Sequence, residues 1–232
     1  MLDDFYDVLS ELSKRTGGPY LLSDCSGMLN WPRQGIYFFF ECGETRRGSE
    51  ELRVVRVGTH AVSRGSKTTL WNRLSQHRGM GNGGGNHRGS IFRLHVGTAL
   101  IRRDYANDEA IQTWGVRGSA DKPTRMNEQR IEEAVSAYIR QMPFLVVKVE
   151  DESGRDSLRA RIEKGSIRLL SAANNSRDAI DTASPRWLGR YAKHPRVRES
   201  HMWNVRDTVG ARDPGFLDCL TQCADRTEPL RQ

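Results

Sequence analysis

Arg73 and His77 are the residues of this chain whose types and spacing most directly suggest chemistry. They lie four positions apart in TTLWNRLSQHR, residues 68–78, where Leu70, Trp71 and Leu74 have helical spacing. Positions i and i+4 project from one side of a helix. A permanent cation beside a titratable ring suits a phosphate, because a fixed guanidinium stabilises charge that builds on the non-bridging oxygens during phosphodiester hydrolysis. The alternative for Arg73 is a solvated residue on a helix surface.

Three apolar segments predict the strands that would position this helix. Residues 35–41 and 52–57 are rich in aromatic and β-branched residues and are separated by the polar stretch CGETRRGSE, which predicts an antiparallel hairpin. The first opens with Gly-Ile-Tyr and the second is followed closely by a glycine, in Arg-Val-Gly. A third strand is predicted at 143–149, PFLVVKV.

Helical periodicity predicts the remaining elements. The expected helices, besides 68–78, cover residues 3–14, 90–102, 126–141 and about 153–173. Between two of them, GMGNGGGNHRGS is expected to be a flexible loop. The predicted fold class is therefore α+β, with a small three-stranded antiparallel sheet flanked by helices.

With these elements in order, the chain resembles the GIY-YIG nuclease superfamily, which includes homing endonucleases, the incision subunit of bacterial excision repair and some type II restriction enzymes. The motifs that carry the resemblance are Gly35-Ile36-Tyr37, Arg56-Val57-Gly58 in the YIG position, Arg73 with His77, and Glu163 in a helix after a strand. The resemblance implies an N-terminal helix and lead-in (1–32), a GIY-YIG-like nuclease core with two inserted helices (33–175), and an Arg- and Trp-rich C-terminal extension packed on that core (176–232).

The resemblance also implies roles for individual residues. Tyr37 would take the proton from the attacking water; its alternative is a core ring with a satisfied hydroxyl. Glu163 would be the metal ligand for Mg²⁺ or Mn²⁺, since one carboxylate with waters and a substrate oxygen suffices for such an ion. Glu132 and Glu133 compete for this role because the inserted helices blur the correspondence. A surface Glu163 paired with Arg159 is the other alternative.

Asn174 follows the Glu163 helix, where members of the superfamily often carry an asparagine, and we expect it to bind substrate.

Arg56 departs from the family pattern, because it replaces the tyrosine of the second motif. A guanidinium cannot act as a general base at neutral pH. We expect Arg56 either to contact the substrate phosphate or to favour the phenolate form of Tyr37. The exchange could also mark a protein that binds DNA without cutting it.

Three further residues are candidates for contacts with the substrate. His87 and Arg88 follow the glycines and are interpreted as a mobile phosphate-contacting loop, with a plain connector as the alternative. His60 comes two residues after Gly58 and would line the same cleft, unless it is a polar turn residue.

Charge and composition indicate the class of partner. The 36 basic residues, of which 30 are Arg, outnumber 29 acidic ones. Arginine matches phosphate in a bidentate manner, which favours nucleic acid, although GC-rich coding would also explain the bias. No run of eighteen apolar residues or secretory leader is seen, so we expect a cytoplasmic protein without a membrane partner.

These observations together predict a metal-dependent endonuclease that hydrolyses DNA, with restriction or phage defence as its expected setting. The alternatives are a catalytically reduced DNA-binding module of the same fold, a nuclease that acts in repair, and a nuclease that cuts RNA. The sequence leaves the oligomeric state open.

Overall fold

The structure is a computed structural model that describes residues 1–61, 65–116, 118–154, 156–175 and 180–231. Its helices and strands are, in chain order, α1 (Leu2–Thr16), β1 (Tyr20–Leu21), β2 (Gly35–Thr45), β3 (Leu52–Thr59), α2 (Leu70–Arg78), η1 (His87–Gly89), α3 (Ile91–Asp104), η2 (Glu109–Gln112), α4 (Lys122–Arg140), β4 (Pro143–Lys148), α5 (Leu158–Leu170), η4 (Leu188–Tyr191), α6 (Pro195–Ser200) and α7 (Phe216–Asp225).

One antiparallel sheet forms the centre of the molecule, in the order β1-β4-β2-β3. Strand β2 lies between its two long neighbours, so that Tyr37 pairs with Gly58 of β3 and with Val146 of β4. The predicted α+β class and the three predicted strands are confirmed, but the sheet has four strands instead of three. The two-residue strand β1 was missed because it is too short to show an apolar pattern, and Tyr20 joins the sheet by pairing with Phe144.

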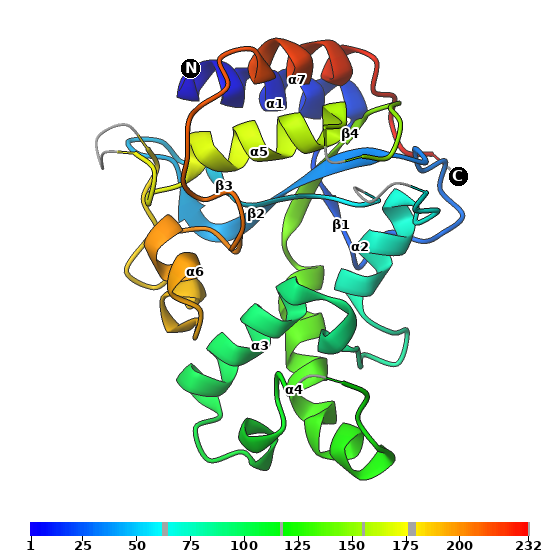
Figure 1. Ribbon diagram of the computed structural model, residues 1–232, viewed down its shortest axis with the longest axis vertical. Coiled ribbons are helices and arrows are strands. Elements are labelled where there is room, and N and C mark those ends of the chain that lie inside the picture. The colour runs from blue at the N-terminus through cyan, green and yellow to red at the C-terminus, as the bar shows by residue number, and fades with distance from the viewer. Residues whose placement is uncertain (62–64, 117, 155, 176–179, 232) are drawn as a thin grey trace.

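Both faces of the sheet are covered, and alternate residues of β2 serve opposite faces. Ile36 and Phe38 pack against α1, α5 and α7, whereas Tyr37 and Phe39 pack against α2, α3 and α4. Figure 1 shows α1, α5 and α7 together on one side of the sheet and the helices α3 and α4 on the other. Each fully buried large apolar side chain contributes about 1.5–3 kcal/mol to this packing.

Capping residues set where two helices begin, and both starts differ from the prediction. α4 begins at Lys122, four residues early, because the Asp121 side chain accepts a hydrogen bond from Thr124 N. α5 begins at Leu158, five residues late, because Ser157 caps it by accepting from Ala160 N. Both caps satisfy backbone N–H groups that the first helical turn leaves unpaired.

The glycine-rich stretch is packed rather than an open flexible loop. The guanidinium of Arg93 occupies the space where a side chain at Gly85 would lie, and it also lies beside Gly79. The expectation of a purely flexible loop was therefore wrong for this part, since the absence of side chains makes room for a buried arginine.

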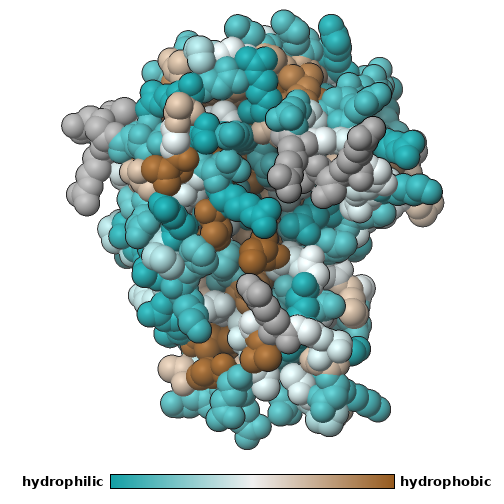
Figure 2. All heavy atoms as spheres, in the orientation of Figure 1, coloured by the Kyte–Doolittle hydropathy of each residue, from teal (hydrophilic) through white to brown (hydrophobic). Residues whose placement is uncertain are grey.

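The C-terminal extension packs onto both sides of the core. Trp187 and Trp203 are buried against the α2–α4 side, and each indole Nε1 donates to Glu41 Oε2 at 3.1 Å. Helix α7 packs against α1 and α5. The surface seen in Figure 2 is mostly hydrophilic with scattered apolar patches, and no helix among the described residues combines the length and apolarity needed to cross a membrane.

Candidate active site

Tyr37 lies on β2 directly opposite Gly58 of β3. The tyrosine ring and hydroxyl occupy the volume that a β carbon at position 58 would need. Glycine at the end of the second motif is thus a packing requirement of the first-motif tyrosine. Tyr37 is fully buried in this arrangement.

His77 joins Tyr37 from helix α2. Its Nε2 lies 2.8 Å from Tyr37 Oη, and its Nδ1 lies 2.8 Å from Ser90 Oγ. The ring is fully buried. Burial, reinforced by the charges of Arg73, Arg56 and Arg93, holds the pKa of His77 well below its ordinary value. His77 is therefore a neutral imidazole at neutral pH.

Arg73 lies one helical turn before His77 on α2, a helix capped by the Thr69 side chain. It is partly exposed, and its Nη1 donates to Gln76 Oε1 at 3.1 Å and to the carbonyl of Gly89 at 3.3 Å. Both bonds are to uncharged groups, so no carboxylate neutralises its guanidinium through a contact among the described residues. Arg73 can therefore offer its charge to an anion from solution.

Glu163 reaches the same region from α5, the helix on the opposite face of the sheet. Its Oε1 accepts a hydrogen bond from Thr59 N at 3.1 Å, at the end of β3, and the side chain is half-buried. Burial raises the pKa of Glu163 to about 7, although the charge of Arg56 and the bond from Thr59 oppose the shift. A divalent ion would favour the ionised form of this carboxylate.

Arg56 belongs to the same group of side chains as Tyr37, His77, Arg73 and Glu163, which we call the cluster. It is buried, its guanidinium carbon lies 4.5 Å from the centre of the Phe92 ring, and its Nη1 donates to the carbonyl of Trp203 at 2.9 Å. Burial lowers the pKa of Arg56, while Tyr37 and Glu163 are close enough to raise it. Its Nε has no hydrogen-bond partner among the described residues. The arginine that replaces the second tyrosine is therefore close enough to interact with both Tyr37 and Glu163.

His60 lies just beyond β3 and helps to join the hairpin to α2. Its Nε2 lies 3.2 Å from the carbonyl oxygen of Arg33, which also accepts from Leu70 N at 3.0 Å. Burial, with the charge of Arg159, lowers the pKa of His60 to about 4. His60 is thus a buried, neutral ring near the cluster, with Nδ1 unpaired among the described residues.

His87 and Arg88 lie away from the cluster and have partners inside the protein. His87 stacks on Trp114 with ring centres 3.9 Å apart, and its Nδ1 lies 2.9 Å from Glu132 Oε1. Arg88 makes a bidentate pair with Glu128, at 2.6 and 2.8 Å. The interpretation of a mobile phosphate-contacting loop does not fit these contacts. The His87 ring and the Arg88 guanidinium already have partners within residues 87–140, which we call the inserted helical lobe.

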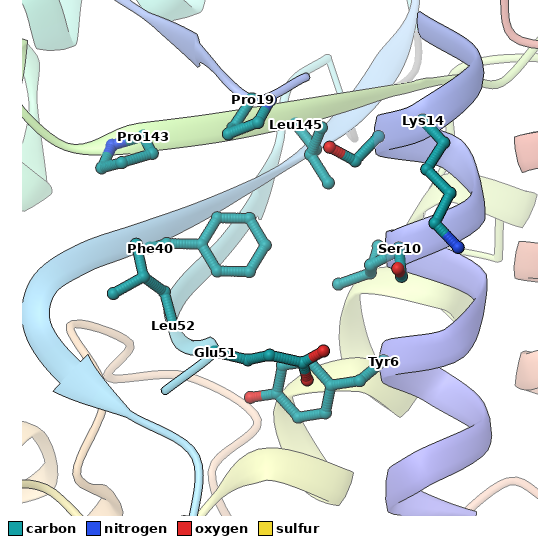
Figure 3. Close-up of a pocket in the computed structure, with 11 residues that line it drawn as sticks. Tyr6, Ser10, Lys14, Pro19, Phe40, Glu51, Leu52, Pro143 and Leu145 are labelled. Atoms are coloured by element: carbon teal, nitrogen blue, oxygen red, sulfur yellow. The ribbon is translucent and has the colours of Figure 1, made fainter. Parts of the chain in front are cut away.

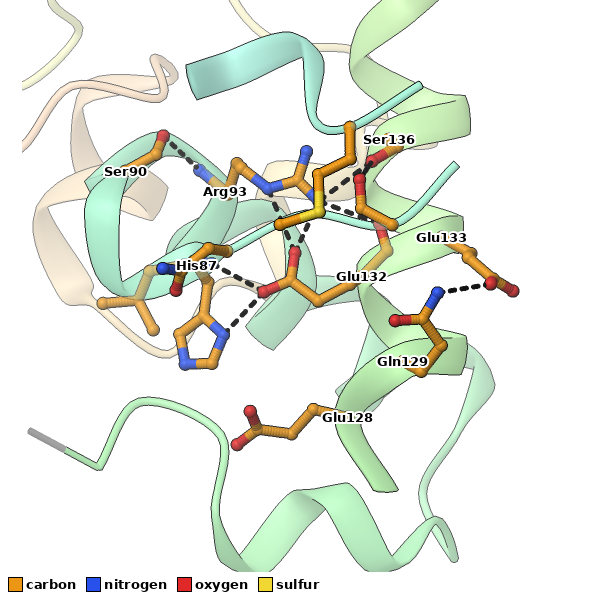
Figure 4. Close-up of polar contacts among 12 residues, drawn as sticks. His87, Ser90, Arg93, Glu128, Gln129, Glu132, Glu133 and Ser136 are labelled. Atoms are coloured by element: carbon orange, nitrogen blue, oxygen red, sulfur yellow. Dashed lines mark hydrogen bonds and ion pairs between the residues drawn. The ribbon is translucent and has the colours of Figure 1, made fainter. Parts of the chain in front are cut away.

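Glu132 belongs to the same buried network, shown in Figure 4. Its Oε2 accepts from Arg93 Nε at 3.0 Å and from Arg93 Nη2 at 2.5 Å, and Arg93 Nη2 also donates to Ser136 Oγ at 3.0 Å. Glu133 is exposed and accepts from Gln129. Of the three glutamates considered as metal ligands, only Glu163 is close enough to Arg56 and Arg73 for their charges to act on it among the described residues.

Asn174 lies just beyond the end of helix α5 and does not reach the cluster through its hydrogen bonds. Its Nδ2 donates to the carbonyl of Arg168 at 3.1 Å and its Oδ1 accepts from Gly210 N at 2.9 Å. Its Nδ2 therefore satisfies a carbonyl in the last turn of the helix, where backbone carbonyls lack partners, and its Oδ1 holds the backbone of Gly210. This is a structural role rather than the expected contact with substrate.

Ser90, Arg93 and Thr59 contact site residues and were missed in the sequence. Ser90 stands just before an apolar helical pattern, which is the signature of a capping residue, but its bond to His77 has no sequence signal. The glycines near Arg93 are the only trace in the sequence of its burial. Thr59 acts through its backbone N–H, which any residue except proline could supply.

A metal ion would have one protein carboxylate here. Among the described residues no group of three or more His, Cys, Asp or Glu side chains could hold a metal. The donor set still fits Mg²⁺ or Mn²⁺, because such ions keep several waters and take further oxygens from a substrate phosphate. Glu163 is the residue that would hold the ion.

A separate pocket of about 290 Å³ lies on the other face of the sheet, between α1 and the strands (Figure 3). Tyr6, Leu9, Phe40 and Leu145 contribute to its mainly apolar lining. It contains none of the predicted site residues.

Comparison with known families gives a match to the GIY-YIG domain over residues 1–230. The match covers the lead-in and the C-terminal extension as well as the cluster. Comparisons with curated proteins and with solved structures give no match.

Proposed function

The chain belongs to the GIY-YIG domain family, and we propose that it is a metal-dependent endonuclease that hydrolyses phosphodiester bonds in DNA. Membership of the family implies a nuclease-type activity and a nucleic-acid substrate. The observation that supports the finer proposal is the cluster around the hairpin end, where the Tyr37–His77 pair meets Arg56 and Glu163 while Arg73 remains partly exposed.

Arg73 would bind the scissile phosphate. Its guanidinium has no carboxylate partner within the described part of the chain and can form two parallel bonds to phosphate oxygens. Charge grows on these oxygens as the reaction proceeds, so the interaction strengthens in the transition state. The loss of such a donor typically costs about 3–4 kcal/mol in activation free energy.

Glu163 would hold Mg²⁺, or Mn²⁺ in its place, through its half-buried carboxylate. When bound, the ion supplies positive charge to a phosphate oxygen and to the leaving 3′-oxygen. The hydrogen bond from Thr59 N fixes one carboxylate oxygen, and the other would be available to hold the ion.

Tyr37 would accept a proton from the attacking water once its own hydroxyl proton has passed to solvent. The resulting hydroxide attacks phosphorus, the bond to the 3′-oxygen breaks, and the 5′-phosphate is released. Because Tyr37 is fully buried in the structure, substrate binding has to open a path to its hydroxyl. His77 Nε2 lies 2.8 Å from the Tyr37 hydroxyl and Arg56 is close enough to interact with it, so both residues would position that hydroxyl.

The second candidate function is DNA binding without turnover. It is favoured by two observations: Arg56 replaces a family tyrosine, and Tyr37 has no exposed surface. In that case Arg73 and the Arg-rich extension would bind the backbone, and no bond would break.

A nicking assay on supercoiled plasmid, with Mg²⁺, Mn²⁺ or EDTA, separates the two functions. We expect wild-type protein to nick DNA with either metal, and Glu163→Gln and Arg73→Ala to lose at least about a hundred-fold in rate. Glu133→Gln is the matched control, since Glu133 is an exposed glutamate on α4. Binding without nicking under either metal would refute the proposed nuclease activity. Loss of activity in Glu133→Gln but not in Glu163→Gln would refute Glu163 as the metal ligand.

Substrate class and setting need their own tests. Matched single-stranded and duplex oligonucleotides of DNA and RNA would show which polymer is cut, and we expect DNA to be preferred. We propose restriction or phage defence as the setting, which a neighbouring methyltransferase gene would support.

A further inference from the structure

Ser90 contacts His77 of the candidate active site and also stands at the start of α3, the first helix of the inserted helical lobe. It is the N-cap of α3, and its Oγ accepts a hydrogen bond from Arg93 N at 3.3 Å. The same oxygen lies 2.8 Å from His77 Nδ1. Ser90 is almost completely buried, so water does not compete for these bonds.

Ser90, His77 and Tyr37 thus form one chain of hydrogen bonds, from Ser90 Oγ through the imidazole to Tyr37 Oη. The imidazole is neutral, because burial and nearby arginines hold the pKa of His77 well below its ordinary value. A neutral ring carries a single N–H, so one ring nitrogen donates and the other accepts. The chain therefore has a direction, which depends on the tautomer of His77.

If Nδ1 carried the proton, it would donate to Ser90, and the Ser90 hydroxyl proton would need another acceptor. Ser90 has none among the described residues. A buried donor left unpaired costs about 1–3 kcal/mol. A serine hydroxyl cannot relieve this cost by ionising near neutral pH.

If Nε2 carries the proton, Ser90 donates to Nδ1 and Nε2–H donates to Tyr37 Oη. The unpaired proton is then that of Tyr37, at the candidate active site. A phenol loses its proton far more readily than an aliphatic hydroxyl. Arg56 lies close enough to interact with the Tyr37 hydroxyl.

We propose that Ser90 is a positioning residue: its hydroxyl donates to His77 Nδ1 and fixes the tautomer whose Nε2–H donates to Tyr37. The inference deepens the proposed function and rests on it, because this direction prepares the Tyr37 oxygen to receive the proton of the attacking water. His77 keeps its own proton throughout. The inserted lobe thereby takes part in preparing the site.

The lobe also holds the backbone of His77. Arg93 Nη1 donates to the His77 carbonyl at 3.0 Å, and Arg93 is itself fixed by Glu132. Ring and carbonyl of His77 are thus both held by the segment 90–93. This double attachment fixes the orientation that the Tyr37 bond requires.

The direct test is ¹⁵N-histidine NMR of the full-length wild-type protein at neutral pH, with His77 assigned by comparison with His77→Gln. Two-bond ¹H–¹⁵N correlations distinguish the tautomers, and we expect His77 to be protonated at Nε2 alone. A signal from Nδ1–H would overturn the proposal. This measurement does not depend on nuclease activity, so a protein that fails to cut DNA but shows the Nε2–H tautomer would refute only the proposed function.

Variants of Ser90 test whether the tautomer matters. Ser90→Asp keeps a helix cap but can only accept, so we expect His77 to move to Nδ1–H and nicking to fall about ten-fold or more. Ser90→Thr keeps the hydroxyl and should retain the tautomer and activity within about three-fold. Asp121→Ala, which removes a cap elsewhere in the lobe, should change neither. Full activity in Ser90→Asp with a changed tautomer would overturn the positioning role.

Discussion

Tyr37 and Gly58 face each other across β2 and β3, and the tyrosine ring fills the space above the glycine. The two sequence motifs of the hairpin are therefore parts of one packing arrangement. The first supplies the hydroxyl that meets His77, and the second supplies the room for it. Arg56, two residues before Gly58, places a buried cation beside the same hydroxyl.

Gly58→Ala should damage both the site and the fold. The added methyl group would overlap the Tyr37 hydroxyl and force the ring away from His77. Overpacking of this kind costs about 1–3 kcal/mol. We expect the free energy of unfolding in urea to fall by that amount and nicking to fall at least about a hundred-fold, the lower end of what one positioned acid–base group contributes. Gly81→Ala is the control, because nothing lies within 4 Å of its added methyl; equal effects in both variants would contradict the packing argument.

Glu132→Ala should act on stability rather than on metal dependence. The change leaves Arg93 buried without its carboxylate and removes the partner of His87. Breaking a buried ion pair from one side typically costs about 3–5 kcal/mol. Urea denaturation should show this loss, whereas the Mg²⁺ concentration that gives half-maximal nicking should stay unchanged in the folded fraction. A large shift in that concentration would restore Glu132 as a candidate metal ligand.

Much of the fold could be predicted because its signals are local. The strands around Tyr37, the helix that carries Arg73 and His77, and the order of elements all follow from apolar periodicity and glycine boundaries. The contacts between distant segments could not be predicted. His87 and Arg88 looked free because their partners lie 45 and 40 residues away, on α4. Burial of a polar side chain depends on packing that a local pattern does not contain.

Removal of the C-terminal extension should prevent folding. Trp187 and Trp203 of the extension are buried, and with Tyr138 they donate hydrogen bonds to Glu41 of β2. A chain that ends at residue 175 would expose this apolar surface and leave Glu41 with one donor. We expect it to be insoluble or to lack a cooperative urea transition, while the full chain shows one. A truncated chain that unfolds cooperatively would show that the extension is a separate addition.

The buried histidine His95 should make stability fall as the pH falls. Burial, with the charges of Arg56 and His194, lowers the pKa of His95 to about 4, below the value of about 6.5 in an unfolded chain. Between these values the unfolded state binds the extra proton, so the free energy of unfolding decreases by about 1.4 kcal/mol per pH unit as pH drops from 6.5 toward 4. Above pH 6.5 both states are neutral and the effect is absent.

Glu163 acts in the opposite sense, because its pKa is raised to about 7 and its protonation on folding favours the folded state at lower pH. The contribution of His95 is therefore isolated by comparing wild type with His95→Gln in urea at pH 7, 5.5 and 4.5. Since the other titrating groups are common to both proteins, the difference between them should change by about 1.4 kcal/mol for each pH unit below 6.5, in favour of the variant. Parallel pH profiles would mean that His95 gains a proton as easily in the folded state as in the unfolded one, which its burial and the unpaired Nε2 argue against.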